Sequence, residues 1–187
     1  MLLPAGVRID GRSGAVTPAT GSYAKHLSEL AGLYRDKAAH AAMVAGQDPL
    51  AYEVVDYRHQ DSDLAFGTTI MAPGRVGDEF FMTRGHFHER RECGETYYTQ
   101  SGEGILLLQS RDGLVRTVEM KPGICAFIPP DWAHRSINTG DEKLVFVWHC
   151  APDAGHEYGE ILEKGMRKLV VARDGRVEIV DNPNFVS

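Results

Sequence analysis

Long hydrophobic runs are scarce in this chain of 187 residues. The run Leu144–Trp148 is far shorter than the ~20 apolar residues that a membrane-spanning helix needs. The segment Met1–Arg8 has no basic stretch followed by a long apolar one, so no signal peptide is predicted. We therefore expect a cytoplasmic protein that does not enter the membrane.

Cysteine and positive charge are also limited. The three cysteines, Cys93, Cys125 and Cys150, stand at wide and irregular spacings, which fits neither a disulfide framework nor a cysteine zinc site. Twenty Lys and Arg residues against 26 Asp and Glu residues give a net charge of −6. No global field attracts the phosphate backbone of a nucleic acid, so we expect no nucleic-acid partner.

Helix signals are few, whereas turn residues are frequent. Twenty glycines and nine prolines fall between short runs rich in β-branched and aromatic residues, which is typical of an all-β sandwich or barrel. The two Asp-Gly steps in Arg111–Leu114 and Arg173–Arg176 indicate hairpins, the second extending from Lys168 to Val180. The predicted strands are Ala51–Arg58, Leu64–Met71, Phe80–His88, Glu95–Ser101, Gly104–Gln109, Leu114–Met120, Cys125–Ile128, His134–Asn138 and Leu144–Cys150.

We expect a single domain in three parts. Residues 1–47 form an N-terminal elaboration, residues 48–160 the β-barrel core, and residues 161–187 a C-terminal hairpin. Within the first part, Asp36 as N-cap, an alanine-rich body from Lys37 to Val44 and a stop at Gly46 predict one helix. The pattern of Tyr23–Tyr34 is compatible with either helix or strand.

The stretch of residues 85–98 carries most of the chemistry. His86 and His88 are two positions apart on a predicted strand, so both imidazoles project from the same face. Glu95 opens the next predicted strand, and an antiparallel return would bring its carboxylate beside them. These residues are three candidate ligands of a metal ion.

His134 is a fourth candidate ligand. It stands alone in Pro129–His134, where a turn precedes another predicted strand. A single histidine in a β protein is more often a hydrogen-bonded core or surface residue than a ligand. Three imidazoles and one carboxylate together suit a divalent transition metal with positions open for a substrate oxygen.

These residues belong to a longer pattern that resembles the two motifs of the cupin superfamily. The six-residue gap between His88 and Glu95 is longer than in the commonest cupins and indicates a subfamily. From about Val7 to Pro183 the chain resembles the cupin-type glucose-6-phosphate isomerases. The strings that carry this resemblance are Thr68–Gly74, Glu79–His88, Pro129–His134, Asp153–Gly159 and Val180–Pro183.

The resemblance implies a cupin barrel that interconverts glucose 6-phosphate and fructose 6-phosphate through an enediol, in glycolysis and gluconeogenesis. It implies one divalent metal ion per chain, with Fe2+ expected and Mn2+, Ni2+ or Zn2+ as alternatives. It also implies a sugar phosphate as the partner molecule and a homodimer. The implied metal ligands are His86, His88, Glu95 and His134.

The resemblance also assigns roles to other residues. Glu95 is the expected base, Tyr97 is expected to orient the sugar, and His156 to assist ring opening. By simple alternation Thr83 and His86 would face opposite sides of one strand, so we expect a bulge at Gly85. The residues implied to surround the substrate phosphate are Tyr52, Thr69, Thr83, Gly85 and Tyr158.

Three alternatives stay open at this point. The isomerisation can proceed by proton transfer or by a metal-assisted hydride shift. The same ligands would serve a cupin dioxygenase, and a related barrel can bind sugars without catalysis. One position departs from the family pattern, because Cys150 stands where archaeal members carry a tyrosine; a neutral, buried thiol is favoured there over a reactive one.

Overall fold

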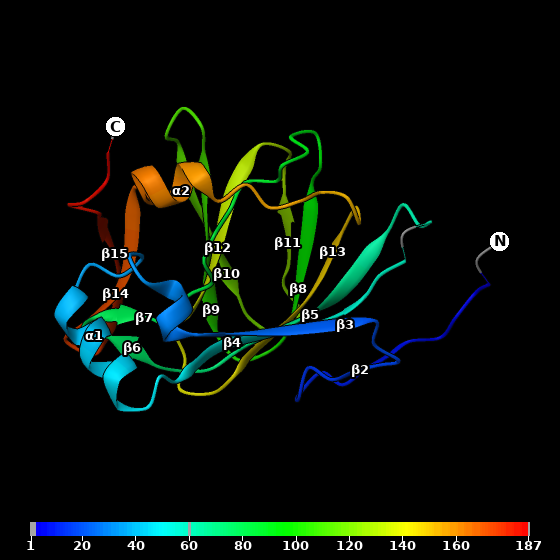
Figure 1. Cartoon of the computed structure of the whole chain (residues 1–187), viewed down its shortest axis with the longest axis horizontal. Helices are drawn as coiled ribbons and strands as arrows, with labels where there is room; N and C mark the ends of the chain where they lie inside the picture. Colours follow the sequence, from blue (N-terminus) through cyan, green and yellow to red (C-terminus); the bar gives the residue numbers. More distant parts are fainter. Residues whose placement is uncertain (1–2, 60, 187) are drawn as a thin grey trace.

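The computed structural model describes residues 3–59 and 61–186. The predicted all-β class is confirmed: antiparallel strands dominate the described chain, and the helices lie at one end of the molecule (Figure 1). None of the described helices is long and apolar enough to cross a membrane. The helices are a 3-10 turn at Leu27–Leu30, α1 (Lys37–Gly46) and α2 (Gly159–Lys164).

The strands follow one another along the chain with short connections. They are β1 (Arg8–Ile9), β2 (Val16–Thr17), β3 (Gly21–His26), β4 (Leu50–Tyr57), β5 (Ala65–Met71), β6 (Arg75–Val76), β7 (Glu79–Phe80), β8 (Glu95–Ser101), β9 (Gly104–Ser110), β10 (Val115–Met120), β11 (Cys125–Ile128), β12 (Trp132–Asn138), β13 (Leu144–Cys150), β14 (Lys168–Arg173) and β15 (Arg176–Asp181).

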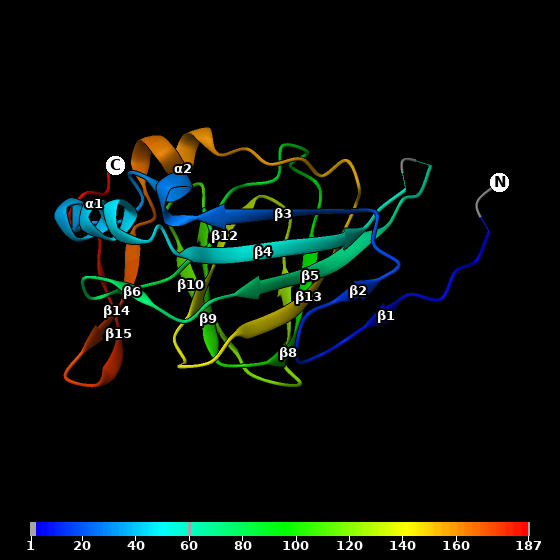
Figure 2. The same cartoon turned by 60° about the horizontal axis from the view of Figure 1, so that its bottom comes forward.

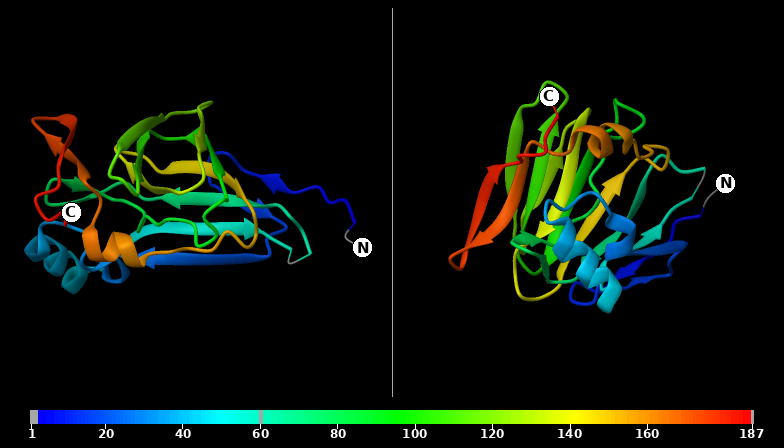
Figure 3. Two further views of the ribbon diagram at one scale, coloured as in Figure 1. Left: turned by 90° about the horizontal axis from the view of Figure 1, so that it is seen from above. Right: turned by 60° about the vertical axis from the view of Figure 1, so that its left-hand side comes forward.

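Two sheets form the layers of the barrel. A six-stranded sheet has the order β11-β8-β13-β5-β4-β3, and a three-stranded sheet has the order β10-β9-β12. Figures 2 and 3 show them as facing layers, with β3, β4 and β5 side by side in one of them. β13 pairs on both sides, with β5 and β8, and its first five residues are buried, which explains its unbroken apolar sequence. These facing antiparallel layers agree with the all-β barrel that the sequence resemblance implies.

The C-terminal hairpin is confirmed. β14 and β15 pair antiparallel, and the two residues between them, Asp174 and Gly175, both have positive φ (49° and 73°), as a type I′ turn requires. β14 also pairs with β7 through Val171 and Glu79. The hairpin thus joins a small four-stranded sheet at the end of the molecule where α1 lies (Figure 3).

The structure decides one open point of the sequence prediction and differs from it at two helices. The segment Tyr23–Tyr34 is extended in β3 and then forms the 3-10 turn. Asp36 accepts a hydrogen bond from the Ala39 amide at 2.9 Å, as an N-cap does, but α1 includes Gly46 instead of stopping before it. The short helix α2 was not predicted, because six residues carry too little helical periodicity to recognise.

The predicted strand Phe80–His88 is wrong as a continuous element. Only Glu79–Phe80 belongs to a named strand, and beyond it the chain makes isolated bridges: Met82 with Ile137, His86 with His134 and Phe87 with Glu157. The segment changes its pairing partner within a few residues, so no regular ladder can form. This irregular segment nevertheless carries two of the four metal-ligand candidates.

Candidate active site and metal centre

The four metal-ligand candidates meet in the barrel. One ligand atom from each of His86, His88, Glu95 and His134 lies within 4.8 Å of the others. The backbone brings His86 and His134 together directly, because the His86 N–H donates to His134 O at 3.3 Å and the His134 N–H donates to His86 O at 3.0 Å.

The route by which Glu95 reaches the group differs from the prediction. The strand that begins at Glu95 does not pair with the segment of the two histidines; Glu95 pairs with Ile128 of β11. The bridge partner of His86 is instead His134, at the start of β12. The expected antiparallel return is therefore wrong, although the side chains still converge.

Glu95 is a buried carboxylate, 7% exposed, that contacts two imidazoles. Its Oε2 lies 3.3 Å from His88 Nε2 and 3.1 Å from His134 Nε2. Burial raises the pKa of Glu95, but the adjacent imidazoles of His134 and His88 lower it by more, and the resulting pKa is about 2. The side chain is therefore ionised at neutral pH.

Backbone carbonyls fix the orientation of two imidazoles. His88 Nδ1 lies 3.0 Å from Cys93 O, and His134 Nδ1 lies 3.2 Å from Trp132 O. Because a carbonyl only accepts, each Nδ1 carries the proton of its hydrogen bond, and each Nε2 is directed toward Glu95. Second partners of this kind are typical of metal-ligating histidines.

The remaining electrostatics also fit a metal ion. Burial, followed by the neighbouring imidazoles of His134, His156 and His88, holds the pKa of His86 well below its usual value, so this ring is neutral. Among the described residues, His134 Nε2 is a buried nitrogen without a hydrogen-bond partner. A buried orphan acceptor in a group of three imidazoles and one carboxylate is what a divalent transition metal would complete.

The group opens on a cleft of about 740 Å³, including open solvent at its mouth. His86, His88 and Glu95 line it, and His134 is buried beside them. The other residues with predicted roles also lie in its wall: Tyr52, Thr69, Thr83, Gly85, Tyr97, His156 and Tyr158.

The predicted bulge at Gly85 is present. The Thr83 N–H donates to Ser136 O at 2.9 Å and the His86 N–H donates to His134 O at 3.3 Å, so three steps along one segment oppose two along the other. Gly85 has a φ of +75°, a conformation that other residues rarely adopt. The extra residue turns both Thr83 and His86 toward the cleft.

Two aromatic groups surround the metal-ligand candidates. The His156 ring lies 4.3 Å from the His86 ring and stacks on Tyr158 at 5.6 Å. The Tyr97 ring lies 5.8 Å from the His134 ring. Burial lowers the pKa of His156 and, with the charge of Glu95, raises that of Tyr97 well above its usual value. At neutral pH the imidazole is therefore a proton acceptor and the phenol a donor.

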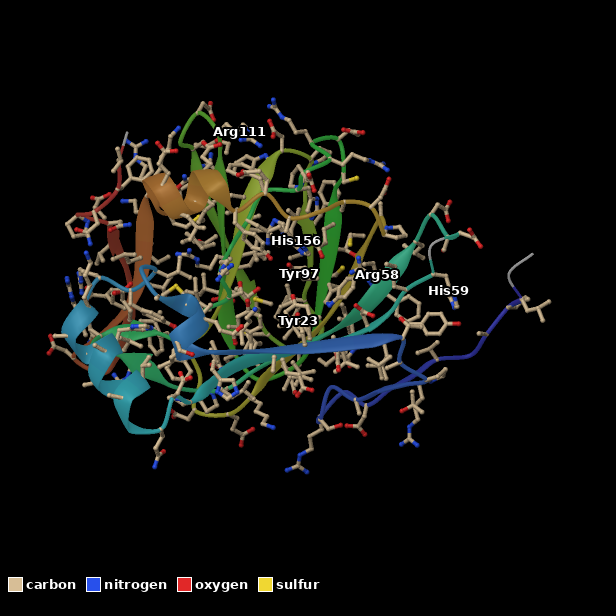
Figure 4. The ribbon with its side chains drawn as sticks, viewed as in Figure 1. Tyr23, Arg58, His59, Tyr97, Arg111 and His156 are labelled. Atoms are coloured by element: carbon tan, nitrogen blue, oxygen red, sulfur yellow. The ribbon has the colours of Figure 1, made fainter. Side chains whose placement is uncertain are left out.

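Sequence reasoning missed two arginines and one tyrosine of the cleft. Arg84 lies over the Tyr158 ring, 5.1 Å from its centroid, and Arg58 lies 5.8 Å from the Trp148 ring. Figure 4 shows Tyr23 and Arg58 directed toward the same interior as Tyr97 and His156. Arg84 stands between two predicted site residues and could have been found; nothing in the sequence around Arg58 or Tyr23 marks them.

Cys150 lines the cleft as well. Burial raises its pKa to about 12, so the thiol is neutral and weakly nucleophilic at neutral pH, as the sequence interpretation favours. The preceding His149 is directed elsewhere, against Phe66 and Thr96.

Comparison with known proteins identifies similar chains. The family model described as Glucose-6-phosphate isomerase (GPI) matches residues 24–186. The chain is 42% identical over 184 residues to the glucose-6-phosphate isomerase of Pyrococcus horikoshii, covering 97% of each chain. It is 43% identical over 184 residues to that of Thermococcus litoralis, covering 97% of this chain and 96% of the other.

One further relative carries a less definite name, and the similarity to solved structures is partial. A putative glucose-6-phosphate isomerase 1 of Rhizobium meliloti is 43% identical over 187 residues, covering 97% of this chain and 87% of the other. Among solved structures, oxalate decarboxylase from Bacillus subtilis aligns with a TM-score of 0.47 at 24% identity, over 57% of this chain and 26% of that one. The family match contains all four metal-ligand candidates.

Replacing one candidate ligand tests the metal centre. We expect His88→Ala to lose most of the metal that the wild-type protein carries, because three ligands hold a divalent ion far more weakly than four. Elemental analysis of the purified proteins measures the metal content per chain. His149→Ala, which removes an imidazole outside the group, should retain wild-type metal; undiminished metal in His88→Ala would exclude the assigned ligand set.

Proposed function

This chain belongs to the glucose-6-phosphate isomerase family, and we propose that its cleft is the active site in which glucose 6-phosphate and fructose 6-phosphate are interconverted. The enzyme is an aldose–ketose isomerase. The observation that carries the assignment of the site is the presence of His86, His88, Glu95 and His134 at one cleft with the hydroxyls of Thr69 and Thr83.

We propose that the substrate phosphate lies at the end of the cleft formed by Thr69, Thr83 and Gly85, with Tyr52 and Tyr158. The Ser136 N–H donates to Thr83 Oγ1 at 3.0 Å, which leaves the Thr83 hydroxyl proton free for a phosphate oxygen. Arg84 adds positive charge to these neutral donors, a contribution that the sequence interpretation did not include.

The reaction moves a proton from C2 of the aldose to C1 through an enediol. Glu95 is ionised and can accept this proton, and the same carboxylate can return it to the neighbouring carbon. Tyr97 stays protonated and can donate a hydrogen bond to a sugar oxygen. His156 is neutral and can accept the hydroxyl proton that is released when the sugar ring opens.

A divalent metal fits the four candidate ligands. When bound there, it would supply positive charge that lowers the free energy of the oxyanion formed during isomerisation. We propose Fe2+ as this ion, with Mn2+, Ni2+ and Zn2+ as alternatives, because such a donor set accepts several first-row ions. The resemblance also supports proposals of a homodimer, a cytoplasmic location and a single cupin domain divided at residues 47 and 160.

The other two functions are less well supported. A dioxygenase would need a pocket suited to an aromatic or thiol substrate, whereas threonine and tyrosine hydroxyls with two arginines line this cleft. A non-catalytic sugar-binding barrel would have no need for a buried, ionised carboxylate among the imidazoles.

Metal add-back tests the proposed function. Metal-stripped protein should have no measurable activity in a coupled assay of fructose 6-phosphate conversion. Separate addition of Fe2+, Mn2+, Ni2+ and Zn2+ should restore activity, most strongly with the physiological ion. Full activity of the stripped protein, or no activity with any of the four ions, would contradict a metal-dependent isomerase.

The phosphate subsite is tested with Thr83→Val. The change removes one hydroxyl while keeping the shape of the side chain, and the loss of a hydrogen bond to a charged group costs about 1.5–3 kcal/mol. We expect KM for fructose 6-phosphate to rise about tenfold or more, with metal content unchanged. Thr117→Val, on the exposed face of β10, is the matched control. A wild-type KM for Thr83→Val would remove this residue from the subsite.

Glu95→Gln separates proton transfer from metal binding. The amide keeps the size and an oxygen donor but loses the charge and the basicity. We expect part of the metal to remain and kcat to fall at least about 10²-fold, the usual scale for a general base. Glu119→Gln, exposed on β10, should behave as wild type.

Isomerisation in deuterated water checks the same step on the wild-type enzyme. Proton transfer through an exchangeable carboxyl group should place solvent deuterium in the product. A product free of deuterium, or near-normal turnover by metal-loaded Glu95→Gln, would favour a hydride shift and exclude Glu95 as the base.

A further inference from the structure

A second cleft is lined by residues of α1, α2 and the C-terminal segment. Figures 1 and 3 show these elements at the same end of the molecule. The segment before α1, the end of α2 and the residues after β15 enclose about 620 Å³, open solvent included. Four cationic side chains line it: Arg35, Lys37, Arg135 and Lys164. Its acidic lining residue, Glu163, is exposed.

Arg135 is the most informative of these residues because it is buried, with 3% exposed. Its Nη2 donates to Arg84 O at 2.7 Å, and its Nε, which lies against Gly85, has no hydrogen-bond partner in the described chain. No carboxylate oxygen of the residues described lies within 4.0 Å of its guanidinium. Arginine stays charged in proteins, and a buried charge without a partner is strongly unfavourable. Arg135 therefore makes no direct ion pair with the described residues, and the negative charge of Glu79 acts on it only at longer range.

A buried carboxylate in the same region does not fill this role. Glu79 is fully buried, and its Oε2 accepts a hydrogen bond from the Arg35 N–H at 2.7 Å. Its Oε1 has no hydrogen-bond partner among the described residues, and its charge acts on Arg135 without a direct ion pair. The charge of Arg35 itself is engaged by Asp78. Arg135 thus lines the second cleft without being held in a direct ion pair.

Two further groups complete a set of oxyanion donors. The Tyr34 hydroxyl lines the cleft and is buried, and its proton has no acceptor among the described residues. Lys37 lies at the exposed rim, at the start of α1. At the end of α2, the carbonyls of Ile161 and Lys164 already accept from Gly165 and Val186, both at 3.0 Å. A guanidinium, a phenol and an ammonium group match a phosphate-type oxyanion.

We propose that this second cleft binds a small phosphate-type oxyanion, with Arg135 and Tyr34 at its floor and Lys37 at its rim. The site is separate from the substrate cleft and does not rest on the isomerase function. The two clefts adjoin at one point, where Arg135 holds the carbonyl of Arg84 beside Gly85.

Calorimetric titration with inorganic phosphate tests the proposal. The metal-loaded wild-type protein should bind two phosphate ions per chain, one in each cleft. Tyr34→Phe and Lys37→Gln should both weaken phosphate binding in the second cleft, Tyr34→Phe by about tenfold. Neither change should alter phosphate binding in the substrate cleft. Arg135→Lys keeps the charge but loses the planar fork and should weaken the same site. Tyr57→Phe and Lys121→Gln, which lie outside both clefts, are the controls.

Two readouts distinguish the second site from the substrate site. Thr83→Val should weaken only the phosphate ion in the substrate cleft, which Tyr34→Phe leaves unchanged. Lys37→Gln should keep the wild-type KM for fructose 6-phosphate. A single phosphate ion per chain that responds to Thr83→Val alone would overturn the proposal. The proposal would also be overturned if a second phosphate ion bound but neither Tyr34→Phe nor Lys37→Gln changed its affinity. This outcome does not depend on whether Arg135→Lys folds.

Discussion

The organisation of the site depends on one buried negative charge. A carboxylate removed from water is tolerated only where charged or hydrogen-bonding partners surround it. The close partners of Glu95 Oε2 are two imidazole nitrogens, His134 Nε2 at 3.1 Å and His88 Nε2 at 3.3 Å. His88 and His134 reach it from different parts of the chain, so the charge is satisfied only when both segments are in place. Backbone carbonyls of Cys93 and Trp132 then fix the two rings.

The fold could be predicted best where one local pattern decides an element. β8, β11 and β13 have the bounds that the sequence indicates, because turn residues bracket short runs whose burial follows from the pattern. The segment Phe80–His88 could not be predicted in this way. Its residues have strand-like composition, but they pair in turn with Ile137, His134 and Glu157, and the choice of a distant partner is not encoded locally.

The candidate site, like the fold, could be predicted where a local pattern marks a residue and not where tertiary packing places it. The spacing of His86 and His88 identifies two candidate ligands by itself, whereas Tyr52 and Thr69 reach the cleft from β4 and β5 and were identified only through the family resemblance. Arg58 follows a strand and its side chain is 40% exposed, and a charged residue in such a place usually indicates nothing more than solvent contact. Its position at the cleft depends on tertiary packing.

The bulge at Gly85 couples the side-chain directions of residues 83–86. One extra residue sets the direction of Thr83 and of His86 at once, and Arg135 packs against the same turn, where a Cβ at Gly85 would lie 3.0 Å from its Nε. A substitution that shifts this turn therefore alters both ends of the substrate cleft together, so effects of paired changes here should not add. We therefore expect substitutions at these four positions to be epistatic.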